Sequence, residues 1–465
     1  MKKFVISRRL LALILAMCLM VLPVFAAQGE TDISVTNGCH SVDAKWSILG
    51  TDQLVENCES AMLYEMDTDT MMYAWNADVQ IYPAGLVKLM TALLVVENAA
   101  MDDAVTVRQD VLETVDTNSL TADLVADEVL TVRDLMYCMM VGSANDAAAV
   151  LAAYTMGSQE AFVEAMNARA KEIGCENTNF VNVHGLHDSQ QVTTPRDLLK
   201  ILREATKNEV FNEFFSATYY TIEETNKSPE RKLVTENYLV SKAGGVEYYY
   251  DSRVIGSRTG ISSNGYRSVA SMAEKNGMRF LCLITGSPDY YSPNGYSVLS
   301  FGGYPETSSL LTLGYNGFVT AQPLYQDQAI RQVQVSGGES DLVLGVSNSI
   351  NTVLPSASKL DNIRFEYSQN IQSLQAPIEK GTVVGTVTLW SGSICIGSSE
   401  LYAMNNVSVQ QLPDSGGNGG WQVLGKVMIV LAVLVVLFLA VLLTMRWIRI
   451  LKVTRKKQTR NRRRR

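Results

Sequence analysis

The stretch that decides how this chain folds is YPAGLVKLMTALL, residues 82–94. Its only charge is on Lys88, and the residues around it have the apolar character of a buried helix that begins just after Pro83. Residues 85 and 88 are three positions apart, so they lie on one face of the predicted helix. That face carries an amine at position 88 and, because position 85 is glycine, no side chain beside it.

Two shorter strings further along the chain combine small and polar residues. GSANDAA at 142–148 leads into a predicted helix that begins at Asn145, and GSRTG at 256–260 stands shortly before GYRSVAS at 265–271. The sequence contains no G-x-S-x-G elbow, no Walker-type loop and no dinucleotide fingerprint. We therefore expect a catalytic or binding site where the three strings meet in the folded chain.

The composition indicates a globular protein with an acidic body and basic ends. Of its 465 residues, 47% are apolar and 18% are charged, which excludes a disordered or low-complexity protein. The net charge of −8 hides 15 basic residues and no acid within residues 1–10 and 446–465. The remainder carries 24 basic and 47 acidic residues, a net of −23. Because phosphate repels so acidic a body, nucleic acid is excluded as a partner.

The two ends predict secretion and membrane anchoring. Residues 1–27 combine a basic start, an apolar stretch and the small-x-small site Val24-Phe25-Ala26, which favours a cleaved signal peptide over a retained anchor. A flexible linker at 411–423 leads to a transmembrane helix at 424–445, whose last 19 residues are uncharged. By the positive-inside rule, the basic tail at 446–465 is cytoplasmic and the body is extracytoplasmic. Binding of the tail to anionic lipid is a less favoured addition.

Between these ends the hydrophobic pattern divides the body into two domains. In residues 28–318 an early hairpin, a series of helices and two late buried strands predict one sheet built from both ends of the domain. Residues 319–410 have strand patterns without helical periodicity, which predicts a small all-β domain. The expected strands are at 61–66, 71–75, 268–273, 279–285, 342–346, 383–389 and 394–396, and the expected helices are at 86–98, 132–140, 145–155, 159–173 and 195–205.

Cysteine and histidine usage does not indicate a metal site. Six cysteines remain after removal of the signal, at positions 39, 58, 138, 175, 282 and 395. Disulfides are allowed in an exported protein, their connectivity stays open, and no C-x-x-C pair suggests zinc. His184 and His187 could form a metal pair, but the glycine between them disfavours the helix that would align them, so a structural loop is favoured. We expect neither a metal nor a cofactor.

The three strings, in this order, resemble the S-x-x-K, S-x-N and K-T-G motifs of the penicillin-binding-protein and β-lactamase superfamily. Flanking residues narrow the resemblance to the D-alanyl-D-alanine carboxypeptidases, the low-molecular-mass penicillin-binding proteins of peptidase family S11. The resemblance runs from about residue 62 to residue 286, and 319–407 is similar to the family's β-rich C-terminal domain. The supporting strings are KLMTA (88–92), NVHGL (182–186), TPRDL (194–198), NYL (237–239) and PIEKGTVVG (377–385).

This resemblance implies a β-lactamase/transpeptidase-like α/β domain, followed by the small all-β domain and the C-terminal transmembrane helix. It also implies that the nucleophilic serine of the family falls on Gly85 and the lysine of K-T-G on Arg258, whose guanidinium can still bind a carboxylate bidentately. The remaining roles that it implies are Lys88 as the base, Ser143 as the proton relay, Asn145 as the holder of the substrate amide, and Arg258, Thr259 and Gly260 as substrate-binding residues.

Glycine has no oxygen with which to attack, and loss of the nucleophile from a triad-type enzyme costs on the order of a millionfold in turnover. Thr91 and Ser143 are not placed by their spacing to replace it. We therefore expect a catalytically inactive protein of peptidoglycan metabolism that binds stem peptides ending in D-Ala-D-Ala. Two alternatives stay open: an active carboxypeptidase with an unrecognised nucleophile or a water in its place, and a purely structural cell-envelope anchor. Any cell-wall protein partners are unidentified.

Overall fold

The computed structural model describes residues 42–43, 47–50, 52–242, 246–293, 298–356, 362–392, 394–410 and 419–461. In the last of these segments, side chains are described for residues 423–448. The expected signal peptide at 1–27 and residues 411–418 of the expected linker lie outside the described residues.

A five-stranded antiparallel sheet forms the centre of the first domain. Its strands are β1 (Ser60–Glu65), β2 (Thr70–Trp75), β7 (Val254–Ile261), β8 (Tyr266–Lys275) and β9 (Met278–Pro288). They follow one another in the order β2-β1-β9-β8-β7, so the early hairpin pairs with the late strand β9 and both ends of the domain build one sheet, as predicted. β7 is an edge strand, and β8 is its only neighbour in the sheet among the described residues.

The helices of this domain include all five that the sequence predicts. They are η1 (Ala84–Val87), α2 (Lys88–Asn98), α3 (Gln109–Leu112), α4 (Val132–Met140), α5 (Asn145–Met156), α6 (Gln159–Ile173), α7 (Pro195–Ala205), α8 (Glu209–Ser216) and α9 (Tyr304–Gly317). Side-chain oxygens of Thr131, Ser158 and Thr194 accept backbone hydrogen bonds at the starts of α4, α6 and α7, which fixes where these helices begin.

The start of α2 differs from the expectation of an α-helix from residue 86. The chain enters this segment through Ala84 at a φ of 47°, and residues 84–87 form the tighter 3-10 turn η1. Lys88 is therefore the first residue of α2. Its amide donates to the carbonyls of Gly85 and Leu86, which joins the turn to the helix.

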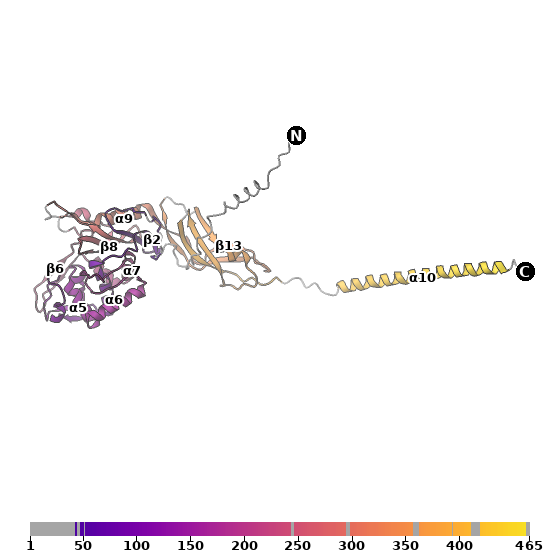
Figure 1. Ribbon diagram of the computed structural model, residues 1–465, viewed down its shortest axis with the longest axis horizontal. Helices are drawn as coiled ribbons and strands as arrows, with labels where there is room; N and C mark the ends of the chain where they lie inside the picture. Colours follow the sequence, from indigo (N-terminus) through magenta and orange to yellow (C-terminus); the bar gives the residue numbers. More distant parts are fainter. Residues whose placement is uncertain are drawn as a thin grey trace, which may run out of the picture.

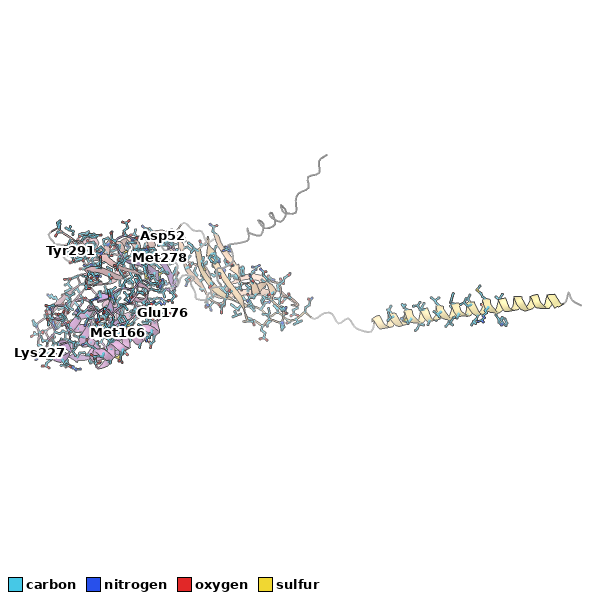
Figure 2. The ribbon with its side chains drawn as sticks, in the orientation of Figure 1. Asp52, Met166, Glu176, Lys227, Met278 and Tyr291 are labelled. Carbon is cyan, nitrogen blue, oxygen red and sulfur yellow. The ribbon has the colours of Figure 1, made fainter. Side chains whose placement is uncertain are left out.

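Helices cover both faces of the sheet, as Figure 1 shows with α9 on one side of β8 and α5 and α6 on the other. One hydrophobic cluster joins the sheet to α2, α4, α5, α6, α7 and α8, and a second joins it to α9. Met166 on α6 belongs to the first cluster and Met278 on β9 to the second, and Figure 2 shows these side chains among the helices and beside the sheet. On the helical side, η1 and α8 contact the edge strand β7.

The smaller elements of the first domain lie in its connections. They are β3 (Ala104–Thr106) paired with β4 (Val129–Thr131), β5 (Tyr219–Ile222) paired with β6 (Arg231–Val234), β10 (Tyr290–Tyr291) paired with β11 (Val298–Ser300), and the short 3-10 turn η3 (Glu247–Tyr249).

A second domain of strands follows, with a hydrophobic core of its own. The strands are β12 (Phe318–Leu324), β13 (Ala329–Val333), β14 (Leu342–Val346), β15 (Ile350–Pro355), β16 (Ile363–Tyr367), β17 (Val383–Ser391) and β18 (Ile394–Ala403), with one 3-10 turn, η5 (Gln369–Ser373). They form a sheet in the order β13-β14-β18-β17-β16 and the pair β12-β15. α9 ends at Gly317 and β12 begins at Phe318, one residue before the expected domain boundary at 318/319.

The last described element is the long helix α10 (Gly419–Asn461), which Figure 1 shows beyond the β-rich region. Within it, the most apolar 18 residues of Val423–Ile448 have a mean hydropathy of 3.3, and none of them is buried against the rest of the chain. At 1.5 Å per residue the 26 residues of Val423–Ile448 are about 39 Å long, which is enough to cross a hydrocarbon core. This helix is a membrane-span candidate by length and composition.

Four of the six cysteines expected in the exported body carry free thiols: Cys58, Cys138, Cys175 and Cys282. Cys395 is disulfide-bonded. Position 39 lies outside the described residues.

Candidate active site

The seven candidate residues from the three motifs all line one cleft of about 470 Å³. The cleft lies between β7 and the helical side of the domain, where η1, the start of α2 and the start of α5 face the strand. Segments far apart in the sequence are thereby brought together. The seven residues are Gly85, Lys88, Ser143, Asn145, Arg258, Thr259 and Gly260.

Lys88 is the centre of a hydrogen-bond network in the helical wall of the cleft. Its Nζ donates to Asn145 Oδ1 at 2.7 Å and to the carbonyl oxygen of His184 at 2.8 Å. Burial lowers the pKa of Lys88 to about 7, and the negative charge of Asp146 opposes part of that change. A large share of this side chain is therefore a neutral amine at neutral pH, which is the form that acts as a base.

Gly85 lies where η1 contacts β7. A Cβ built on Gly85 would be 3.1 Å from the carbonyl oxygen of Thr259 and 3.3 Å from the Cα of Gly260. A Cβ on Gly260 would be only 2.8 Å from the nitrogen of Gly85, so position 260 has to be glycine for the two segments to meet. At Gly85 a side chain would be tight but would require a shift of only a few tenths of an ångström.

Ser143 and Asn145 flank the start of α5. Ser143 has a φ of 55°, which turns the chain out of α4, and its side chain makes no hydrogen bond with any described residue. The backbone amide of Asn145 donates to the carbonyl oxygen of Leu120 at 2.8 Å, which ties α5 to a loop that lines the cleft. The hydroxyl of Ser143 is therefore free to bind a ligand or to relay a proton.

Asp146 is a site-supporting residue that the sequence did not single out. Its buried carboxylate accepts hydrogen bonds from the amides of Ala122, Leu124 and Ala147, at distances between 2.8 and 3.1 Å. Burial raises the pKa of this carboxyl, and the backbone amides act in the opposite direction. The residue thereby fixes the loop that carries Leu120, a lining residue of the cleft, onto the start of α5. No local pattern marks it, because two of its partners, Ala122 and Leu124, lie more than 20 positions away.

The guanidinium of Arg258 is held mainly by the protein. Nη1 donates to the carbonyl oxygen of Ser257 at 2.5 Å, and Nη2 donates to the carbonyls of Phe214 and Ala217 at the end of α8. The group stacks on the ring of Phe215, and its Nε is buried with no acceptor among the described residues. Burial lowers the pKa of Arg258 to about 9. The sequence could not predict the orientation of this guanidinium, because an arginine that binds a ligand carboxylate and an arginine that binds carbonyls at a helix end are the same residue in the sequence.

Other polar groups near the cleft have structural partners. Thr91 is fully buried and its hydroxyl donates to the carbonyl oxygen of Val183 at 2.6 Å, so it cannot replace a missing nucleophile. His184 Nδ1 accepts from the amide of Leu186, and burial together with Lys88 lowers the pKa of His184 to about 4. His187 contacts the ring of Tyr82. In the part of the chain that the structure describes, no group of three or more potential metal ligands occurs.

Asn118, Ser119, Glu236 and Phe301 also line the cleft, and the sequence did not single them out. These residues come from loops that meet only in the folded chain, so their spacing carries no signal.

Comparison with known proteins agrees with this architecture. A profile of the D-alanyl-D-alanine carboxypeptidase family matches residues 50–288, and a profile of the penicillin-binding protein 5 C-terminal domain matches residues 318–409. D-alanyl-D-alanine carboxypeptidase DacC of Escherichia coli is 30% identical over 344 residues, which cover 71% of this chain and 80% of that protein. DacF of Bacillus subtilis is 27% identical and covers 73% and 83% of the two chains.

Solved structures agree with the same fold. Penicillin-binding protein 5 of Haemophilus influenzae superposes with a TM-score of 0.62 at 25% identity, covering 77% of this chain and 99% of that one. DacD of Francisella tularensis superposes with a TM-score of 0.61 at 22% identity and supports the fold. With both of its domains matched in order, this chain belongs to the D-alanyl-D-alanine carboxypeptidase family, peptidase S11, whose members are penicillin-binding proteins of peptidoglycan metabolism.

Proposed function

We propose that this chain is a membrane-anchored, extracytoplasmic protein that binds peptidoglycan stem peptides ending in D-Ala-D-Ala and does not cleave them through an acyl-enzyme. The observation that carries the proposal is the glycine at position 85, one turn before Lys88 in the chain and in contact with β7. Acyl transfer needs an oxygen at that position, and the hydrogen bonds that the structure gives the Lys88 amine go to Asn145 and to the carbonyl oxygen of His184, not to a hydroxyl.

Binding is supported by the groups that the cleft retains. Lys88 and Asn145 keep their hydrogen bond, Ser143 has an unengaged hydroxyl, and Arg258 contributes positive charge with no carboxylate paired to it among the described residues. Hydrogen bonds to charged groups contribute roughly 1.5–3 kcal/mol each, so a ligand with a carboxylate can bind here without forming a covalent bond.

Anchoring is supported by α10 and its flanks. The apolar segment Val423–Ile448 is long enough to span a bilayer, and the basic residues from 446 onward favour a cytoplasmic tail. The sequence of residues 1–27 supports export of the remainder, which puts the cleft on the same side of the membrane as peptidoglycan.

The test is mass spectrometry of the full-length protein in detergent after incubation with penicillin, with calorimetry of a D-Ala-D-Ala peptide alongside. We expect no mass increase from the drug and a weak but measurable affinity for the peptide. A drug adduct mapped to a serine or threonine of the first domain would identify an active carboxypeptidase with another nucleophile. Absence of both labelling and peptide binding would favour a structural anchor.

A further inference from the structure

Lys88 carries a nucleophilic atom in the cleft to which the proposed function gives no reaction. Because position 85 is glycine, the amine has no hydroxyl there from which to remove a proton. A buried lysine amine that has lost its own proton is a nucleophile for carbonyl compounds. Its reactivity then depends on whether the lone pair of the nitrogen is free.

The hydrogen bonds of Lys88 account for both N–H bonds of the neutral amine. Nζ donates to Asn145 Oδ1 at 2.7 Å and to the carbonyl oxygen of His184 at 2.8 Å, and no described residue donates a hydrogen bond to this nitrogen. Burial lowers the pKa of Lys88 to about 7, so about half of the molecules carry the neutral form at pH 7. The two acceptors therefore hold the amine in place and leave its lone pair unused.

Lys200 on α7 is a largely buried lysine without this property. Its side chain is 10% exposed, and its Nζ forms an ion pair with Asp43 at 2.6 Å and donates to the carbonyl oxygen of Gly174 at 2.7 Å. An ammonium held by a carboxylate has no lone pair to offer. Lys88 forms no ion pair with any described residue, and the carboxylate of Asp146, which acts on it through space, is bound by backbone amides.

Two further polar groups of the cleft can bind a ligand beside the amine. Ser143 and Asn145 both line the cleft, and neither the hydroxyl of Ser143 nor Nδ2 of Asn145 donates to a described residue. Two such donors are complementary to a carboxylate. A 2-oxo acid carries a ketone and a carboxylate on adjacent carbons, and it is small enough for a cleft of about 470 Å³.

We propose that Lys88 is a covalent binding site for 2-oxo acids, which it captures as an imine while Ser143 and Asn145 bind the carboxylate. The lone pair of Nζ attacks the keto carbon, and the carbonyl π electrons move to the oxygen, which takes up a proton released by the nitrogen. That hydroxyl then leaves as water together with the remaining proton of the nitrogen, which completes the C=N double bond. The site goes beyond the proposed function, because it requires no peptide in the cleft.

Reductive trapping on the full-length protein in detergent tests this site. The protein is incubated at pH 7 with pyruvate and sodium cyanoborohydride, which reduces an imine to a stable secondary amine, and peptide mapping by mass spectrometry measures the label at each lysine. A solvated lysine with a pKa of about 10.4 has fewer than about one neutral amine in a thousand at pH 7. We expect Lys88 to be labelled at least about tenfold faster than the exposed lysines, and Lys200 to stay unlabelled.

Acetone separates the carboxylate contact from the reaction of the amine, because it has the ketone without the carboxylate. The ratio of pyruvate to acetone labelling should be about fivefold higher at Lys88 than at the exposed lysines, and Ser143→Ala should lower it. Ser119→Ala is the matched control, because Ser119 also lines the cleft but its hydroxyl already donates to the carbonyl oxygen of Asp116 at 2.6 Å. It should leave the ratio unchanged.

Each outcome decides the proposal. Labelling of Lys88 no faster than that of the exposed lysines would overturn the covalent site, and labelling of Lys200 at the same rate as Lys88 would overturn the role of the free lone pair. A pyruvate-to-acetone ratio at Lys88 equal to that of the exposed lysines, or unchanged in Ser143→Ala, would overturn the carboxylate contact and with it the choice of 2-oxo acids. The proposed function is unaffected by all of these results, since it is decided by the binding of stem peptides.

Discussion

The charged residues of the two walls of the cleft have different kinds of hydrogen-bond partner. The helical wall consists of η1 and the starts of α2 and α5. There the amine of Lys88 donates to Asn145 and to the carbonyl oxygen of His184, so its hydrogen-bond partners are other residues that line the cleft. In the strand wall, the guanidinium of Arg258 is directed to carbonyls of β7 and of the end of α8. Under the proposed function, the helical wall lacks the attacking oxygen while Lys88 has its hydrogen bonds within the cleft, whereas the strand wall carries a positive charge that is directed toward the protein.

This difference separates bond making from binding. A missing oxygen at Gly85 can be restored by one substitution, because the hydrogen bonds around Lys88 do not depend on it. The orientation of Arg258 involves a helix end, a strand and the ring of Phe215, so it is a property of the fold around the cleft. Variants at the two positions should therefore affect chemistry and stability separately.

The largest effect is expected for Gly85→Ser, which should make the protein react covalently with penicillin. The new hydroxyl would lie one turn before Lys88, whose neutral amine can remove its proton, and we expect the acylation rate to rise by at least about a thousandfold. Mass spectrometry of the drug adduct measures it. The added Cβ at 3.1 Å from the Thr259 carbonyl requires a small shift of η1 or β7, which lowers the rate but does not block the fold.

Gly85→Ala is the control for this substitution, because it adds the same Cβ without the oxygen. It should remain unlabelled, which would assign the gain to the hydroxyl. A folded Gly85→Ser protein that stays unlabelled would mean that the helical wall has lost more than one atom, and the structural-anchor alternative would then be the better account.

A smaller effect is expected for Arg258→Ala, which should weaken the attachment of α8 to the sheet. Loss of the hydrogen bonds to Phe214 and Ala217 and of the stacking on Phe215 should lower the local free energy of opening by about 2 kcal/mol. Hydrogen exchange of residues 209–217 measures it as roughly thirtyfold faster exchange. Arg258→Lys keeps the positive charge but not the two-pronged guanidinium, and its exchange rate should lie between those of the wild type and Arg258→Ala.

Arg331→Ala provides the comparison in the second domain, where a guanidinium stacks on Tyr367 at 4.5 Å. It removes the same side chain and should leave exchange in α8 unchanged. Unchanged exchange in Arg258→Ala would show that the guanidinium does not hold α8, and the strand wall would then be as open to ligand as the helical wall.

The same contrast explains how far the sequence could predict the molecule. The helices at 132–140, 159–173 and 195–205 have the predicted bounds because Thr131, Ser158 and Thr194 cap them locally. Four of the five strands of the sheet were predictable because they are short apolar runs at the two ends of the domain, whereas β7, which carries the polar string at 256–260, was not among the expected strands. The helix bounds and these strands both depend on residues that are neighbours in the sequence or on a regular spacing of apolar residues.

The parts that could not be predicted depend on contacts between distant segments. Asp146 holds residues 122 and 124, and Arg258 reaches residues 214 and 217, and neither partner is marked by a motif. The 3-10 turn at η1 follows from the conformation of Ala84, which only the surrounding fold fixes. The motifs thus identified which residues meet in the cleft, but not the direction in which Arg258 points.

The smallest effect is a pH dependence of the restored reaction. Burial lowers the pKa of Lys88 to about 7, so the neutral amine increases from about a tenth of the molecules at pH 6 to about nine-tenths at pH 8. The rate of penicillin acylation in Gly85→Ser should therefore rise about tenfold over this range, with its midpoint near pH 7. Asp146→Asn in the same background removes the negative charge that opposes the shift, so it should move the midpoint to lower pH. A midpoint near pH 10 would mean that the amine of Lys88 is solvated, and an unchanged midpoint in the double variant would mean that Asp146 does not act on it. Either result would remove the electrostatic distinction between the two walls.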